Sequence, residues 1–388
     1  VKHMRAGFPD AEFQTRLAEV QTRMADAQIA ALLLTTEADV RYLTGFLTRF
    51  WESPTRPWFL VVPATADPVA VIPSIGADLM ARTWINDIRT WRAPDYKDDG
   101  VTLLAATLSE IVPKGERIRV PSGNGTHLRM PLGDWEWLQS LLPDRRLGHD
   151  AGAMRAQRMV KSEAEIDKIA AACAVANCAF ESVPEIAQSG VLLSDVFRRF
   201  QIQCLKEGAD YVPYLAGGAG QGGYGDVISP AADVPLAEGD VLMLDTGLVR
   251  DGYFCDFDRN FSIGPAGPEV QAAHARLVEA CAAAFEIARP GRTAADLFYA
   301  MDGILTKGAG GTDAGRLGHG LGMQLTEPPS LIPEDDTPLQ PGMVLTLEPG
   351  IDLGSGRIMV HEENIVIRDG AAEWLSSPAG PAIREIGA

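Results

Sequence analysis

The chain has 388 residues, and its 46% hydrophobic, 22% charged and 7% aromatic residues are typical of a globular protein with enough length for two domains. This composition excludes an intrinsically disordered chain. The formal net charge of −18 argues against nucleic acids and membranes as partners, because phosphate backbones and anionic lipids would be repelled, and leaves a small molecule or short peptide as the expected partner.

The first 150 residues alternate between helical and strand patterns. Residues 10–27 have helical periodicity, and residues 29–36 (IAALLLTT) form a short apolar run that is typical of a buried strand. Further strands are predicted at 58–64, 69–73 and 117–121, and helices near 75–85, 101–112 and 132–142. This alternation predicts an N-terminal α/β domain over residues 1–150.

A second domain is predicted over residues 151–388. Ser162 followed by Glu165 has the pattern of a capping box, which predicts the start of a long helix. Helical patterns recur at 268–289 and 294–307, and strand-like segments punctuated by Gly and Pro lie at 239–249, 252–264, 341–351 and 357–370. We therefore expect an α/β (α+β) protein whose second domain carries its acidic residues on strands.

The cysteines and the apolar segments bear on the cellular compartment. The five cysteines form no CxxC pair, and their odd number argues against a disulfide framework. Neither an apolar stretch long enough to span a membrane nor a secretory signal is visible in the sequence. We expect a cytoplasmic protein.

Two aspartates enter apolar strand patterns. In VLMLDTG, alternation places Val241, Met243 and Asp245 on one strand face, so the acid projects where its neighbours suggest burial. Asp256 lies eleven residues later, after the turn-like segment RDG at 250–252, so a hairpin can bring the two acids together. Either acid alone is more typical of a turn or a surface, but a buried pair requires a cation.

Three further residues extend this pattern. In GHGLGM, glycines flank His319, so the backbone can approach another segment closely and the imidazole stays uncrowded. Val344, Thr346 and Glu348 alternate in MVLTLEPG, and Glu362 lies fourteen residues beyond Glu348 in the apolar segment MVHEENIVI. A lone histidine is usually only a polar residue, so His319 is a candidate ligand only because the acidic residues accompany it.

Together these residues form a mostly oxygen ligand set for two divalent ions, Mn first and Fe, Co or Zn as alternatives. The charge of four carboxylates requires two such ions. A metal pair holds a bridging hydroxide and clamps the oxygens of a tetrahedral intermediate, which predicts hydrolysis of an amide or short peptide. The predicted ligands are Asp245, Asp256, His319, Glu348 and Glu362.

The ordered motifs DxG, Asp, GHGxG, LEPG and Glu resemble the pita-bread metallopeptidases. This family includes Xaa-Pro aminopeptidases, prolidases and methionine aminopeptidases, and also creatinase, ectoine hydrolase and a dimethylsulfoniopropionate lyase. The resemblance covers about residues 150–380, and the N-terminal domain is similar to that of creatinases and prolidases. It implies a C-terminal pita-bread catalytic domain and a homodimer.

The resemblance also implies roles for the ligands. Asp245 would chelate one ion, Asp256 and Glu362 would bridge both ions, and His319 with Glu348 would hold the other. Glu348 would in addition carry a proton to the leaving nitrogen, since a carboxylate beside an acidified water can accept its proton.

The sequence departs from the family at two histidines. Ile228 stands where the peptidases and creatinase carry a histidine seventeen residues before Asp245, and Thr326 replaces a second histidine seven residues after His319. A proton donor or oxyanion donor is typically worth about 10²–10⁴ in rate, so a replacement is expected. The candidates are His361, Tyr224, Asp226 and Thr326 itself.

Two other features depart from the family or from the acidic composition. Asp258 stands where the family usually has a threonine that supports a metal ligand, so it is expected to be an outer acid or a sixth ligand.

Residues 46–59 are aromatic and basic. One alternative is that they are part of a core. The other is that they form a specificity loop: in related dimers this region reaches the active site of the partner subunit, where Arg49, Trp51 and Arg56 could meet a substrate carboxylate.

Three functions remain open at this point. The first is a Xaa-Pro-type exopeptidase or dipeptidase, which the five ligands favour. The second is a non-peptidase enzyme of the same fold that acts on a small amidine, ring amide or sulfonium compound, which the two missing histidines favour. The third, a binding protein with an inactive site, is disfavoured by the complete ligand set.

Overall fold

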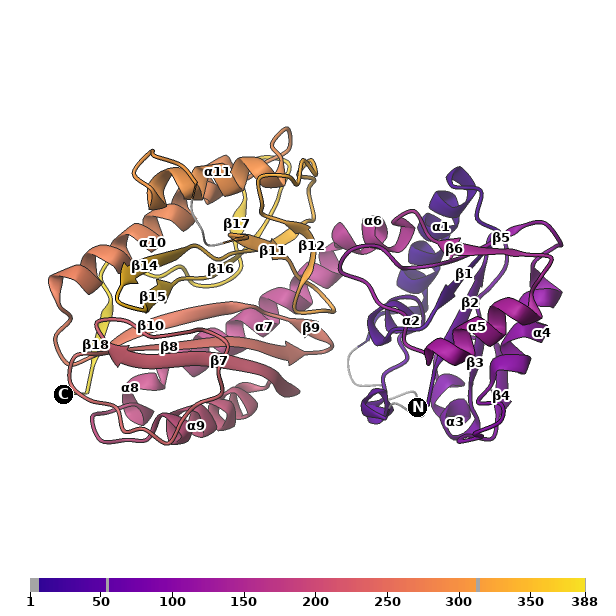
Figure 1. The fold of residues 1–388 in the computed structure, drawn as a ribbon, viewed down its shortest axis with the longest axis horizontal. Helices are drawn as coiled ribbons and strands as arrows, with labels where there is room; N and C mark the ends of the chain where they lie inside the picture. The colour runs from indigo at the N-terminus through magenta and orange to yellow at the C-terminus, as the bar shows by residue number, and fades with distance from the viewer. Residues whose placement is uncertain (1–6, 54–55, 312–314, 388) are drawn as a thin grey trace. The chain divides into compact units, whose positions relative to one another are not determined.

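The computed structural model describes residues 7–53, 56–311 and 315–387. The chain divides into two units, Val1–Arg158 and Met159–Ala388 (Figure 1). The sequence placed this boundary at residue 150, and helix α6 (Ala153–Met159) occupies the interval. Within the described ranges, no helix is long and apolar enough to cross a membrane.

The N-terminal unit is built on one mixed six-stranded sheet with strand order β4-β3-β2-β1-β5-β6. Its strands are β1 (Ala31–Leu34), β2 (Phe59–Pro63), β3 (Val69–Pro73), β4 (Asp87–Trp91), β5 (Arg117–Val120) and β6 (Arg146–His149). Its helices are α1 (Asp10–Asp26), α2 (Glu37–Thr44), α3 (Ala77–Met80), α4 (Val101–Ile111) and α5 (Leu132–Leu141), with 3-10 turns η1 (Arg49–Glu52) and η2 (Ser74–Gly76). Every residue of β1, β2 and β3 is buried, as expected for a sheet covered on both faces.

One helix of this unit is shorter than predicted. The sequence indicated a helix near 75–85, but α3 ends at Met80. The Thr83 hydroxyl and N–H both donate to the Met80 carbonyl, which closes a turn instead of continuing the helix.

The C-terminal unit contains two five-stranded sheets and a hairpin. The first sheet has the order β18-β10-β8-β7, with β9 attached to β8, and the second has the order β12-β11-β13-β16-β17. The strands are β7 (Tyr211–Gln221), β8 (Asp240–Arg250), β9 (Tyr253–Phe254), β10 (Phe257–Ile263), β11 (Gly318–Gly320), β12 (Glu327–Ser330), β13 (Val344–Leu347), β14 (Gly350–Gly354), β15 (Arg357–Val360), β16 (Glu363–Val366), β17 (Glu373–Trp374) and β18 (Arg384–Ile386).

Helices pack against both sheets of this unit (Figure 1). The long helix α7 begins after Ser162, whose side chain forms the predicted capping box with Glu165. At its other end, the Phe180 ring lies 4.9 Å from that of Phe200 and 5.4 Å from that of Phe257 on β10. The helices are α7 (Glu163–Glu181), α8 (Val183–Ile186), α9 (Leu193–Glu207), α10 (Pro268–Ile287) and α11 (Ala294–Leu305).

Three strands differ from the sequence prediction in ways that shape the site. The segments 252–264 and 357–370 are each interrupted, because Asp256 lies between β9 and β10, and Glu362 lies between β15 and β16. Strand β7 was missed because glycine is rare in strands. Gly217 is needed there, since a Cβ on it would lie 2.1 Å from the Met243 carbonyl oxygen.

Candidate metal centre

The two sheets bring three carboxylates together. Asp245 lies on β8, and Asp256 and Glu362 lie in the two strand interruptions. Carboxylate oxygens of these three residues lie within 4.8 Å of one another. Because side chains in a regular strand alternate between faces, the interruptions allow two acids to turn toward Asp245 independently of their neighbours.

His319 and Glu348 complete the cluster from the second sheet. His319 Nε2 lies 3.3 Å from Asp256 Oδ2 and 3.4 Å from Glu348 Oε2. Glycine is required on both sides of the histidine, because a Cβ on Gly318 or Gly320 would lie 2.3 Å or 2.2 Å from a backbone carbonyl oxygen. The structure therefore places all five predicted ligands in one cluster.

The orientation of His319 suits a metal ligand. Its Nδ1 lies 2.8 Å from the Gly320 carbonyl oxygen, which can only accept a hydrogen bond, so Nδ1 carries a proton and Nε2 faces the acids. Burial would lower the pKa of His319, but hydrogen bonds and charge interactions with Asp256 and Glu348 raise it to about 10. A bound cation would replace the proton on Nε2.

The hydrogen bonding of the buried acids also suits a bound cation. Asp245 Oδ1 and Glu362 Oε2 are buried and have no hydrogen-bond partner among the described residues. Burial, followed by the charges of the neighbouring carboxylates, raises the pKa of both groups well above the usual range. Since an unpaired buried carboxylate is costly, these oxygens are the expected contacts of divalent ions.

The chain matches the profiles of two known protein families. The profile of Metallopeptidase family M24 matches residues 167–369, which is more than half of the chain, and that of the Creatinase/Prolidase N-terminal domain matches residues 16–160. The chain belongs to metallopeptidase family M24. This confirms the resemblance seen in the sequence motifs, the order of the two domains and the conclusion that the protein is a hydrolase.

Relatives of this M24 protein match along most of its length. Probable dipeptidase PepE of Mycobacterium bovis is 31% identical over 376 residues, which is 95% of this chain and 96% of the relative. A Xaa-Pro dipeptidase of Pyrococcus horikoshii is 27% identical over 251 residues, or 64% of this chain and 71% of the relative. The crystal structure of dipeptidase PepE from Mycobacterium ulcerans has a TM-score of 0.85 at 27% identity, covering 99% of this chain and 100% of that one. These relatives support a peptidase function.

The positions of the two missing family histidines are both exposed in this M24 protein. Ile228 has 81% of its surface exposed in the loop between β7 and β8. The Ile228 and Ser229 N–H groups donate to Asp226 Oδ1, and these bonds hold the pKa of Asp226 below its usual range. Asp226 is therefore a weak candidate for a proton donor. Thr326 is exposed directly before the buried Glu327.

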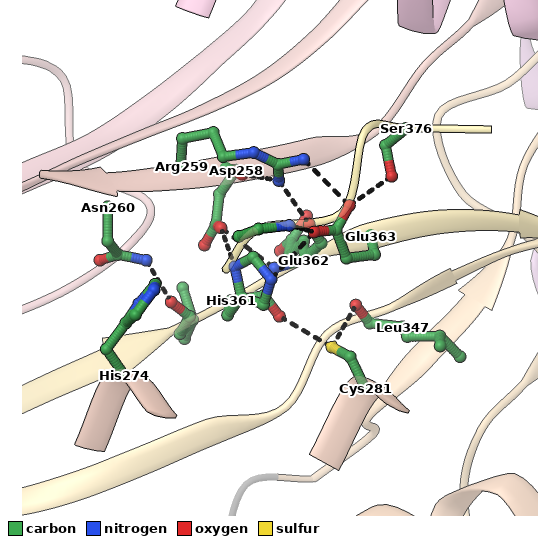
Figure 2. Close-up of polar contacts among 12 residues, drawn as sticks. Asp258, Arg259, Asn260, His274, Cys281, Leu347, His361, Glu362, Glu363 and Ser376 are labelled. Carbon is green, nitrogen blue, oxygen red and sulfur yellow. Dashed lines mark hydrogen bonds and ion pairs between the residues drawn. The ribbon is translucent and has the colours of Figure 1, made fainter. Parts of the chain in front are cut away.

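His361 and Tyr224 occupy different positions from those expected of groups that contact substrate. Both ring nitrogens of His361 face carboxylates, with Nδ1 3.2 Å from Asp258 and Nε2 3.1 Å from Glu363 (Figure 2). Tyr224 is 1% exposed, and its hydroxyl accepts a hydrogen bond from the Val360 N–H at 2.6 Å. Both side chains contact the segment next to Glu362.

The aromatic and basic segment belongs to the N-terminal unit. Trp51 is buried and its ring lies 6.0 Å from that of Trp58, which favours the core alternative for this residue. Arg49 is exposed on η1. Arg56 is half-buried with its guanidinium 5.0 Å from the ring of Phe50.

Two residues beside the ligands were not predicted from the sequence. The side chain of Asn364 accepts from the Asp256 N–H at 2.9 Å and donates to the Asp256 carbonyl oxygen at 2.6 Å. Arg316 Nε donates to Glu348 Oε1 at 2.9 Å. The available signal for Asn364 was a polar amide directly before the apolar residues of β16. Nothing in the sequence around Arg316 indicated that it would contact Glu348.

A buried ion pair supports the loop after His319. Lys161 Nζ lies 3.1 Å from Glu327 Oε2, and only 1% and 3% of these side chains are exposed. The other carboxylate oxygen of Glu327 accepts from the Gln324 N–H at 3.0 Å. The pair therefore connects the start of the C-terminal unit to the segment that carries His319.

Lys161→Met is expected to lower the free energy of unfolding by about 3–5 kcal/mol, because it removes the cation that faces the buried Glu327 carboxylate at 3.1 Å. Urea unfolding followed by circular dichroism measures this loss. The double variant Lys161→Met/Glu327→Leu should regain most of the stability, since an apolar pair carries no buried charge. A loss below about 1 kcal/mol in the single variant, as for exposed ion pairs, would contradict the expectation.

Proposed function

We propose that this chain is a dinuclear metal-dependent hydrolase that cleaves a short peptide at its N-terminal end, as Xaa-Pro dipeptidases and aminopeptidases do. Asp245, Asp256, His319, Glu348 and Glu362 would hold two divalent ions, with manganese as the preferred metal. The observation that carries the proposal is the convergence of five side chains, four of them buried, in which two carboxylate oxygens have no hydrogen-bond partner among the described residues.

The roles of the side chains follow from their contacts. Divalent ions bound at this centre would supply an acidified water and stabilise negative charge on the attacked carbonyl oxygen. Glu348 is the proton carrier, since its Oε2 lies toward His319 while Arg316 holds Oε1. His319 keeps its Nδ1 proton on the Gly320 carbonyl and so presents Nε2 to the acids. We assign Thr326 a hydroxyl contact with the leaving group.

The proposal extends to the assembly and the compartment. The protein acts as a cytoplasmic homodimer, in which Arg49 and Arg56 of one subunit meet the carboxylate of the peptide that the other subunit binds. An arginine suits this contact because its planar guanidinium binds a carboxylate through two parallel hydrogen bonds.

A second candidate function is favoured by one observation. Ile228 and Thr326 replace two family histidines, and a substrate that needs no proton donor there would not be affected. A small amide or amidine, as in creatinase-like and ectoine hydrolase-like enzymes, or a sulfonium compound, as in a dimethylsulfoniopropionate lyase, fits this condition.

Proline release from Gly-Pro and Ala-Pro by manganese-loaded protein separates the two functions. If the protein is a peptidase, wild-type turnover should lie well below the ordinary enzymatic rate of about 10 per second. Ile228→His should then raise it, because a proton donor typically contributes about 10²–10⁴ in rate. Ile228→Asn is the matched control, since it is polar but titrates nowhere near neutral pH.

Other outcomes have distinct meanings. Wild-type proline release near 10 per second would contradict the claim that the two replacements are costly. Conversion of a small amide, amidine or sulfonium compound without any proline release would favour the second function, and Ile228→His should slow that reaction.

A further inference from the structure

Next to Glu362 lies a layer of four ionisable side chains, Asp258, Arg259, His361 and Glu363 (Figure 2). Asp258, His361 and Glu363 are each no more than 1% exposed. Asp258 stands on β10 directly opposite Asp245 in the strand register. None of the four is needed to account for the five-ligand cluster.

This layer holds the backbone of Glu362 from both sides. The Glu362 N–H donates to Asp258 Oδ1 at 3.0 Å, and the Glu362 carbonyl oxygen accepts from Arg259 at 3.1 Å. The N–H and the carbonyl oxygen of Glu362 are therefore both hydrogen-bonded. Side chains supply these bonds, because a residue in a strand interruption does not receive them from its own sheet. The direction of the Glu362 side chain is consequently set by Asp258 and Arg259.

His361 connects the two ends of the layer. Its Nδ1 lies 3.2 Å from the same Asp258 oxygen that holds Glu362, and its Nε2 lies 3.1 Å from Glu363 Oε1. Glu363 in turn pairs with Arg259 at 3.0 Å and accepts from the Ser376 hydroxyl and, at 2.7 Å, from the Ala379 N–H. Asp258, His361, Glu363 and Arg259 therefore form one continuous chain of contacts.

We propose that Asp258 and His361 act as one positioning unit: Asp258 fixes the backbone of Glu362, and His361 holds the Asp258 carboxyl group in place. The inference rests on the proposed metal centre. One oxygen of Asp258 meets both His361 and the Glu362 N–H, so a change in either side chain alters the contact of the other. The two side chains should therefore depend on each other.

The test is a double-mutant cycle on Mn²⁺ affinity, measured by competition with a chelator. Asp258→Asn and His361→Leu should each weaken Mn²⁺ binding about 10- to 100-fold, as loss of a partner of a metal ligand typically does. Independent losses would multiply in a double variant. Asp258→Asn/His361→Leu should instead bind within about threefold of wild type, since it changes both members of the unit together and retains an amide oxygen as acceptor for the Glu362 N–H.

A spectroscopic measurement separates positioning from general destabilisation. The visible absorption spectrum of Co²⁺-substituted protein reports ligand geometry, so it should change in the single variants and return in the double variant. Asp39→Asn is the matched control, because Asp39 is also a buried acid, paired with Arg158 at 2.9 Å in the N-terminal unit. It should lower stability and leave Mn²⁺ affinity and the Co²⁺ spectrum unchanged.

The outcomes are distinguishable. Single variants that bind Mn²⁺ as tightly as wild type, or a double variant as weak as the product of the single losses, would overturn the positioning unit alone. A wild-type protein that binds no divalent metal would overturn the metal centre and the proposed function with it. If a single variant does not fold, the double variant decides, since near-wild-type binding supports the unit and weak binding overturns it.

Discussion

Asp245→Asn and Glu362→Gln are each expected to leave the protein without its full metal content and to reduce hydrolysis on the order of 10³-fold or more. Asp245 Oδ1 and Glu362 Oε2 are buried oxygens of the proposed ligands that have no hydrogen-bond partner among the described residues, so they depend strongly on a cation. An amide keeps the size of the side chain but removes the negative charge that binds the ion. Elemental analysis after reconstitution with Mn²⁺ and a peptide hydrolysis assay measure both effects.

Cys255→Ser is the control for these variants. Cys255 is buried directly before Asp256, and its thiol contacts the Thr246 carbonyl oxygen rather than any of the proposed ligands. This variant should retain metal and activity. Full metal content in Asp245→Asn, or metal loss in Cys255→Ser that matches that of the ligand variants, would contradict the assignment of the ligands.

Removal of divalent metal is expected to lower the thermal unfolding midpoint of the C-terminal unit by roughly 8–16 °C. A ligand present at about 1,000 times its dissociation constant stabilises the folded state by about 4 kcal/mol. A domain of this size shifts its midpoint by about 2–4 °C for each kcal/mol. Differential scanning calorimetry with and without a chelator measures the shift, and the N-terminal unit serves as an internal reference because it contributes none of the ligands.

The difference between the thermal unfolding midpoints of metal-loaded and metal-free protein should also become larger as the pH rises. Burial raises the pKa of Asp245 and Glu362 in the metal-free fold, so these groups hold protons that the unfolded chain loses near pH 4. The stability that goes with a raised carboxyl pKa is present below the unfolded pKa and fades as the pH rises toward the folded pKa. Bound metal replaces those protons. A midpoint difference that stays constant between about pH 5 and pH 8 would contradict this linkage.

The cluster of side chains at the candidate metal centre was predictable from the sequence because each of these residues has a local signature. Alternation in the strand patterns indicated that Asp245 projects into a core, and the glycines around His319 indicated a close backbone approach. The start of α7 was equally local, since a capping box involves residues only three apart. Such features depend on the chemistry of neighbouring residues, which one sequence contains in full.

The contacts of His361, Tyr224 and Asp258 were decided only by the tertiary structure. His361 is adjacent to a predicted ligand, and the sequence therefore suggested a proton donor; in the fold its two partners are Asp258, 103 residues away, and Glu363. Tyr224 contacts Val360 across 136 residues. The packing of Asp258 and Arg259 on β10 against Glu362 determines which side chains a buried carboxylate meets, and no local sequence pattern records that packing.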